Sequence, residues 1–340
     1  MAIENVPDAR EIEQTAIRLY FTAWEHVTDI IIPLLESHSG SIQLIDRTLT
    51  PTKDEMDFDG SIISVITEAE AEAVLKQYIA RAQPDLHLCY ALIQQSQEIA
   101  LKARICAVSP FLLLLGSEVK SWAKPNGDFT DFRTLDAVDL IRVVNAVCSK
   151  PVSEQFATKF DIIRRGRNKI QHLGSFKDAI DPIAALDVLV EQWLELFPDR
   201  SWLQEFKGII IDHHISTIVD DSDFGEVWSM LGNIERANLM LTDRQRRRLF
   251  GISDKARLFD CFYCRHESKW DDRGNDSRIA TLEPNGNIVH CHLCLENTKV
   301  SRIRCFDPEC GCDVIYAEGD YEGECAVCGE PQPLASEASA

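Results

Sequence analysis

The sequence lacks a long hydrophobic run, an excess of positive charge and a glycine-rich loop of the kind that binds nucleotide phosphates. Its longest purely apolar stretch is Phe111–Leu115, far shorter than the roughly 20 residues needed to cross a bilayer as a helix. Lys and Arg number 35 against 55 Asp and Glu, a net charge of −20, which argues against general coating of nucleic acid or an anionic membrane. Any nucleic-acid site must therefore be a local basic patch.

The chain also lacks the opening of an exported protein. Acidic residues, among them Glu4, Asp8 and Glu11, stand where a secretory signal would have basic residues and an apolar stretch. We therefore expect a cytoplasmic, reducing location and no membrane partner. With 340 residues, of which 45% are hydrophobic and 26% charged, we expect a globular protein of two or three domains.

Apolar residues recur at helical spacing up to about residue 243, and a segment rich in Cys, Gly, Asp and Pro follows. Thr67 and Glu70 predict a capping box, Pro84 is expected in the first turn of a separate helix, and short strands are expected within residues 41–64. The fold class is therefore mainly α. The expected divisions are a helical domain over 1–200, a helical extension over 201–255, cysteine modules over 256–332 and a flexible tail over 333–340.

Nine of the 12 cysteines fall between Cys261 and Cys328. In a reducing compartment, dense and paired cysteines indicate metal ligands rather than disulfides. Three pairs have two intervening residues, a spacing that lets both thiolates bind one tetrahedral ion. The sequence predicts two structural zinc ions per chain, held by Cys261, Cys264, Cys291 and Cys294, and by Cys305, Cys310, Cys325 and Cys328.

Spacing leaves one ligand of the second group open, because Cys312 can replace Cys310. Gly311 and Gly329 each follow the second cysteine of a pair, where the tight turn requires a positive φ. The segment resembles tandem zinc ribbons with short β-hairpins. Because the cysteines are sufficient to close both coordination shells, no catalytic metal is expected.

The other informative stretch lies in a helix expected to begin near Val152. Four cations fall within six positions and His172 follows them; the cations are Arg164, Arg165, Arg167 and Lys169. Arg can bind phosphate through two parallel hydrogen bonds, and His can move protons near neutral pH. Together they can cleave RNA without metal, the Arg neutralising the scissile phosphate and the His transferring a proton of the 2′-hydroxyl or the 5′-oxygen.

Arg167, Asn168 and His172 resemble the signature of HEPN ribonucleases, in which an Arg and a polar residue precede a His by a few positions. The helix around Glu98 and the turn that follows it, Ser109-Pro110-Phe111-Leu112, are similar to the central helix and turn of that family. The resemblance extends over about residues 10–197 and implies a HEPN-like helical bundle and a metal-independent endoribonuclease, such as a toxin or an antiviral defence nuclease. It implies catalytic roles for Arg167, Asn168 and His172, beside RNA-binding roles for Arg164, Arg165 and Lys169.

On an ideal helix Arg167 and His172 point about 140° apart, since each residue turns by about 100°. A homodimer, common among HEPN relatives, would bring a second motif into the same cleft. The expected partners are RNA, a second copy of the chain and a regulatory or inhibitory protein. The alternative is a non-catalytic dimeric protein that binds nucleic acid or protein through its zinc ribbons. A second basic cluster either contacts RNA phosphates or complements a helix end; it consists of Arg244, Arg246, Arg247 and Arg248.

Overall fold

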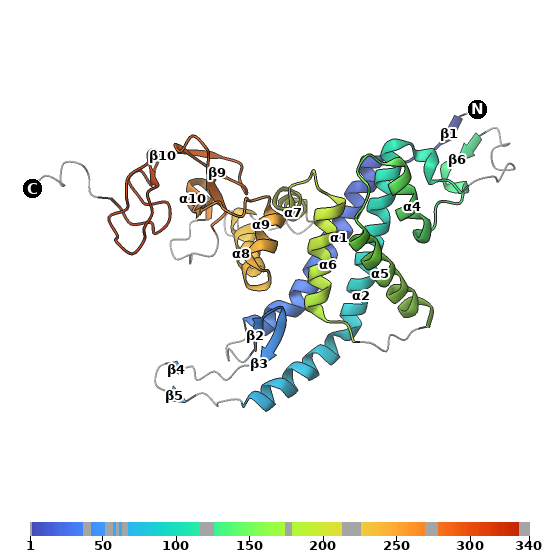
Figure 1. Cartoon of the computed structure of the whole chain (residues 1–340), viewed down its shortest axis with the longest axis horizontal. Helices are drawn as coiled ribbons and strands as arrows, with labels where there is room; N and C mark the ends of the chain where they lie inside the picture. Colours follow the sequence, from blue (N-terminus) through green and yellow to red (C-terminus); the bar gives the residue numbers. More distant parts are fainter. Residues whose placement is uncertain are drawn as a thin grey trace, which may run out of the picture. The chain divides into compact units, whose positions relative to one another are not determined.

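A computed structural model describes residues 2–36, 42–51, 57–58, 61–62, 67–115, 126–173, 179–212, 226–268 and 278–332. The chain divides into two compact units, Met1–Asp199 and Arg200–Ala340. It is mainly helical, with a β-rich region near its C-terminus (Figure 1). The residues expected as a helical extension, 201–255, lie in the second unit together with the cysteine-rich segment.

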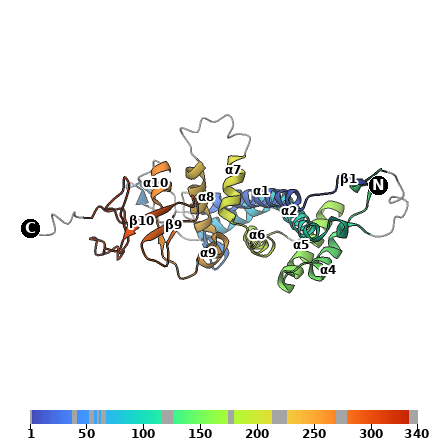
Figure 2. The ribbon, with the colours of Figure 1, turned by 90° about the horizontal axis from the view of Figure 1, so that it is seen from above.

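The first unit is a helical bundle in which α2 packs against every other long helix that the structure describes there. Helices α1 and α2 lie alongside each other (Figures 1 and 2). The helices are α1 (Ala9–Leu35), α2 (Glu68–Val108), α4 (Ala137–Val147), α5 (Glu154–Leu173) and α6 (Pro182–Leu196), with 3-10 turns at Pro110–Leu113 and Phe129–Asp131.

Short strand pairs accompany these helices. Strand β1 (Ala2–Glu4) pairs in parallel with β6 (Asn126–Asp128). The strands expected within residues 41–64 are confirmed as two antiparallel pairs. They are β2 (Ile42–Ile45) with β3 (Thr48–Pro51), and β4 (Asp57–Phe58) with β5 (Ser61–Ile62).

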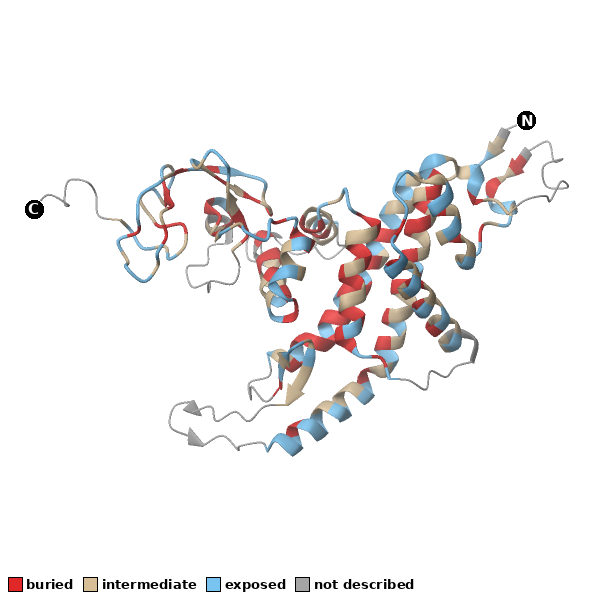
Figure 3. Ribbon diagram, in the orientation of Figure 1, coloured by how far each residue is buried: buried red, intermediate tan, exposed pale blue. Residues whose placement is uncertain are grey.

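Aromatic side chains from α1 and α6 form the centre of this bundle. The ring of Tyr20 lies 5.0 Å from that of Trp193, which lies 5.0 Å from that of Phe197. All three side chains are buried. Figure 3 shows the buried residues gathered along α1 and α6, whereas the N-terminal end of α2 is largely exposed.

The start of α2 is confirmed and its predicted interruption is wrong. Thr67 caps the helix, and its capping box with Glu70 is complete, because each side chain accepts a hydrogen bond from the other's backbone amide. Pro84 does not begin a new helix but lies inside α2. Tertiary contacts hold the helix on both sides of it: Leu86 is buried, and the Gln83 side chain accepts from the Ile180 amide at 2.8 Å.

The second unit begins with short helices and continues into an antiparallel sheet. The helices are α7 (Trp202–Ile211), α8 (Glu226–Met240), α9 (Asp243–Phe250) and α10 (Phe262–Ser268). The sheet has the order β11-β10-β9-β8-β7, and neighbouring strands are antiparallel. Its strands are β7 (Leu258–Phe259), β8 (Ala280–Leu282), β9 (Ile288–Cys291), β10 (Asn297–Ser301) and β11 (Ile315–Tyr316).

Contacts between distant segments of this unit join the two cysteine-rich parts. The Asp260 amide donates to the Ala326 carbonyl at 3.0 Å. Arg265, directly after Cys264, forms a 2.7 Å ion pair with Glu324, directly before Cys325. The two cysteine-rich parts therefore pack against each other rather than fold as independent modules.

Candidate metal centres and the basic helix

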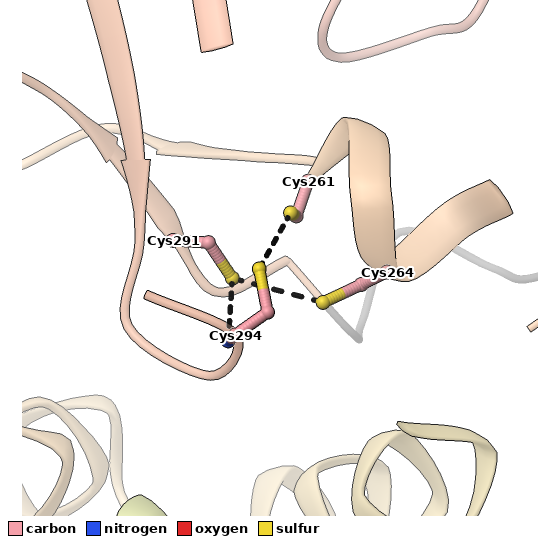
Figure 4. A group of neighbouring side chains, drawn as sticks. All are labelled: Cys261, Cys264, Cys291 and Cys294. Carbon is pink, nitrogen blue, oxygen red and sulfur yellow. Dashed lines mark hydrogen bonds between the residues drawn. The ribbon is translucent and has the colours of Figure 1, made fainter. Parts of the chain in front are cut away.

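The first cysteine group assembles from the start of α10, with Cys261 just before it and Cys264 within it, and from the end of β9 and the turn that follows, with Cys291 and Cys294. Cys261, Cys264, Cys291 and Cys294 have their Sγ atoms all within 4.8 Å of one another. Figure 4 shows the four sulfurs pointing toward a common centre. The Cys261–Cys294 and Cys264–Cys291 sulfur pairs are 3.5 and 3.8 Å apart.

In the second group the structure brings Cys310, rather than Cys312, together with the other three cysteines. The sulfurs of Cys305, Cys310, Cys325 and Cys328 lie within the same 4.8 Å limit. Cys312 lies outside this group: its buried Sγ is directed at the Val314 carbonyl, 3.6 Å away. The Cys312 carbonyl instead accepts from the Cys305 amide at 2.7 Å, so Cys312 shapes the loop that carries Cys305 and Cys310.

The spacing of the sulfurs fits a tetrahedral metal ion. A zinc–sulfur bond of about 2.3 Å places tetrahedral sulfurs about 3.8 Å apart, and the shortest sulfur pairs of the two groups measure 3.5 to 3.8 Å. The amides of Leu293 and Cys294 donate to the Cys291 sulfur at 3.3 and 3.5 Å, which stabilises a thiolate there. Each group can therefore hold one metal ion.

Four thiols at this separation favour ionisation of two of them, because hydrogen bonds from the neighbouring thiols lower the pKa of both Cys291 and Cys294. Hydrogen bonds from Cys261, Cys264 and Cys291 lower the pKa of Cys294. A bound divalent ion replaces the remaining protons, so the binding of metal releases protons.

The same left-handed turn follows the second cysteine pair of each group, but a different residue type occupies it in each. Gly329 has φ +75° and its amide donates to the Cys325 carbonyl at 2.9 Å. Leu295 stands at the matching position of the first group, with φ +66° and a 3.0 Å bond to the Cys291 carbonyl. The predicted positive φ of Gly329 is confirmed, as is that of Gly311, at +58°. No glycine marks the turn at Leu295, so this turn could not be predicted from the residue types.

The helix predicted to carry RNA chemistry is α5. Phe156, Phe160 and Ile163 are buried on one face of it. Arg167 continues that face and is half-buried, and its Nη1 donates to the Asn168 Oδ1 at 3.2 Å. The Arg167 Nε is buried and has no hydrogen-bond partner among the described residues. His172 lies on the last turn of α5, and its side chain is outside the part that the structure describes.

A row of polar residues on α2 lies near Arg167. Sequence analysis did not identify these residues as neighbours of Arg167. Glu98 accepts from Lys102 at 2.7 Å and from Gln94 at 3.0 Å. Burial opposes the ionisation of Glu98, but these hydrogen bonds and the charges of Lys102 and Arg167 outweigh it and lower the pKa of Glu98. The i, i+4, i+8 spacing of the row is the signal that could have revealed it.

Acidic partners reduce the charge of the basic stretch. Asp161 binds Arg164 at 2.6 Å and Arg165 at 2.7 Å. Arg165 and Lys169 are exposed, and Arg164 is half-buried. The predicted RNA-binding residues therefore lie together on α5, with one carboxylate among them.

The second basic cluster lies on α9. Arg246 binds Asp243 and donates to the Asn238 side chain at 2.7 Å. Arg247 donates to the Ala256 carbonyl at 2.8 Å. Arg246 therefore joins α9 to α8, and Arg247 joins α9 to the segment that follows it. Arg244 and Arg248 are exposed.

Comparison of the chain with protein-family models, with curated proteins and with solved structures finds no match. The resemblance to HEPN ribonucleases accordingly depends on the residues of α2 and α5 themselves. None of the described helices is both long and apolar enough to span a bilayer.

Proposed function

We propose that the protein is a metal-independent endoribonuclease of the HEPN type, with its catalytic residues on α5. The observation that carries this proposal is the concentration of cations on one helix of a chain with net charge −20, together with the bond between Arg167 and Asn168 five residues before His172. A toxin or an antiviral defence nuclease is the corresponding role.

In this proposal Arg167 stabilises the charge that develops on the scissile phosphate. His172 transfers a proton of the attacking 2′-hydroxyl or of the leaving 5′-oxygen. Asn168 and the Glu98 carboxylate keep Arg167 in place, while Arg164, Arg165 and Lys169 bind neighbouring phosphates. Because one helix offers a single Arg and a single His, the active species is a homodimer with two motifs in one cleft.

We further propose that the metal of both cysteine groups is zinc and that the modules are zinc ribbons. All-thiolate tetrahedral sites are typical of structural zinc. The modules contribute to the choice of RNA or of a regulatory or inhibitory protein. They take no part in the chemical step, because four thiolates leave no coordination position for substrate or water.

A non-catalytic binding protein is the second candidate, and specific contacts favour it. Asp161 pairs with Arg164 and Arg165, and Arg167 is half-buried beside Asn168 and Glu98. Arginines held in this way can have a purely structural role in the helical bundle. In that case the second unit would carry the function by binding nucleic acid or protein.

Cleavage of RNA by the purified chain in metal-depleted buffer separates the two candidates. We expect products with 2′,3′-cyclic phosphate ends and no cleavage of DNA, which lacks the attacking hydroxyl. Arg167→Ala and His172→Ala should each slow cleavage by about 10²-fold or more. Arg142→Ala, which removes an exposed arginine of α4, is the matched control and should cleave at the wild-type rate.

A mixture of Arg167→Ala and His172→Ala chains tests the shared cleft. Heterodimers should cleave RNA faster than either variant alone. Equal cleavage by wild type and both single variants, each shown to be folded, would exclude Arg167 and His172 as catalytic residues, and no cleavage by the wild type would favour the binding protein.

A further inference from the structure

The two cysteine groups match in geometry and differ in exposure. Cys261 and Cys294 have their sulfurs 3.5 Å apart in the first group, and Cys305 and Cys328 have theirs 3.5 Å apart in the second. In the first group three cysteines are buried and Cys294 is intermediate, whereas in the second Cys328 is exposed and Cys310 intermediate. One ligand of the second group is therefore open to solvent.

Exposure decides which thiolate a dissolved oxidant reaches. Oxidation of cysteine requires thiolate character and access, and metal binding gives thiolate character to all eight ligands. Access then distinguishes the groups. On the proposed function's assignment of zinc, we propose that Cys328 is an oxidation site that reacts with peroxide, and that the resulting Cys305–Cys328 disulfide releases the metal ion of the second group.

The step is balanced as follows. The Cys328 thiolate attacks the peroxide O–O bond, which yields a sulfenic acid and hydroxide. The Cys305 thiolate then attacks the Cys328 sulfur and displaces a second hydroxide as the S–S bond forms. Two thiolates lose two electrons, one hydrogen peroxide gains them, and the zinc ion, left with Cys310 and Cys325, dissociates.

Neighbouring contacts favour Cys305 over Cys312 as the second sulfur. Cys305 lies 3.5 Å from Cys328, whereas the buried Cys312 sulfur is directed at the Val314 carbonyl. The disulfide would keep the turn after Cys325 joined to the loop at Cys305, so reduction by a small thiol can restore the four-thiolate site.

Controlled oxidation of the full zinc-loaded chain tests this inference. Hydrogen peroxide is added, released zinc is followed with a chromophoric chelator, and disulfides are mapped by mass spectrometry after alkylation. We expect one of the two ions to be released first, together with a Cys305–Cys328 disulfide, while the first group keeps its ion. Release of both ions at the same rate, or a disulfide first found between Cys261 and Cys294, would overturn the inference.

Paired histidine variants provide the control, because His can also bind zinc. Cys328→His should slow peroxide-driven release from the second group several-fold, whereas Cys294→His should leave that release unchanged. Unchanged zinc release in Cys328→His would contradict Cys328 as the oxidation site. So would a Cys305–Cys328 disulfide that forms in the wild-type chain no faster than any other disulfide. A purified chain without two zinc ions before oxidation would instead refute the zinc proposal, and this inference with it.

Discussion

At the scale of single residues, the turns behind the cysteine pairs show how one backbone shape is reached by two sequences. Leu295 and Gly329 occupy the same left-handed conformation after Cys294 and Cys328, at φ +66° and +75°. For Leu this conformation costs about 1 kcal/mol, and its side chain is 53% exposed, so little packing offsets the cost. The turn that places Cys294 among the other three cysteines thus overrides the local preference of Leu295.

Substitution of Gly329 tests this account. Among the described residues, a Cβ at Gly329 would meet the Arg265 guanidinium alone, at ordinary contact distances of 3.5 to 3.8 Å. The cost of Gly329→Ala therefore comes from φ, and we expect it to lower the stability of the metal-loaded module by about 1 kcal/mol. The measurement is thermal unfolding at saturating zinc.

Leu295→Gly is the converse control. It relieves the strain at φ +66° but increases the freedom of the unfolded chain. We expect no loss of stability from it. A loss as large as that of Gly329→Ala would show that the turns are not equivalent.

The choice between Cys310 and Cys312 shows the limit of spacing as evidence. Both are close enough in sequence to Cys305 to serve as its partner. The decision depends on the left-handed Gly311 between them, and on the bond from the Cys305 amide to the Cys312 carbonyl. Paired spacing predicted the other seven members of the two cysteine groups because each of those pairs is a local turn, or has no nearby competitor.

At the scale of elements, α2 shows which helix features could be predicted from sequence. Its start follows from the Thr67 capping box, and the start of α6 follows from Asp181, which accepts from the Ile183 amide at 2.9 Å. Both are local signals. The continuation of α2 through Pro84 depends on contacts with residues distant in sequence, such as Ile180. A local sequence pattern does not contain such contacts. Proline in a helix interior costs about 3 kcal/mol, so tertiary packing is needed to offset it.

A buried hydroxyl ties α2 to two other helices. The Ser96 Oγ donates to the Ala16 carbonyl of α1 and accepts from the Gln192 Nε2 of α6, both at 2.8 Å. Ser96 and Gln192 are fully buried. Ser96→Ala would leave the Gln192 amide without this acceptor, so we expect the first unit to lose about 1–3 kcal/mol of unfolding free energy.

Chemical denaturation of the purified chain measures this loss. Thr22→Ala is the matched control, because the exposed Thr22 hydroxyl donates to the Arg18 carbonyl of the same helix at 2.9 Å. It should change stability by no more than about 0.5 kcal/mol. Equal effects of the two variants would show that the Ser96 bridge contributes nothing.

At the scale of the whole molecule, the two units are stabilised by different means. The first has an aromatic core around Tyr20 and Trp193. In the second, Trp202 packs on Phe206 and Phe250, with ring centroids 4.9 and 5.5 Å apart. The strands that follow are short, and we expect their segment to depend on metal ions held by the two cysteine groups for cross-links.

A contact within the second unit extends this dependence to α7. The Gln204 side chain donates to the carbonyls of His292 and Leu293 at 3.0 and 2.8 Å. These carbonyls belong to the turn between Cys291 and Cys294. Loss of the first metal ion should therefore loosen α7 as well as β9.

Removal of metal should accordingly affect the two units differently. Binding of a structural zinc ion contributes about 10–16 kcal/mol to the folding of small domains, so the cysteine modules should unfold when a strong chelator removes the metal, while α1, α2 and α6 stay folded. Hydrogen exchange read by mass spectrometry should show amides of β9 and β10 losing protection and those of α2 keeping it. Cys261→Ser should give the same pattern without chelator, whereas Cys89→Ser, at a buried cysteine of α2 outside both groups, should leave β9 and β10 protected. Retained protection of β9 and β10 in a chain shown to be metal-free would mean that the sheet and its side-chain contacts, rather than metal, hold the second unit together.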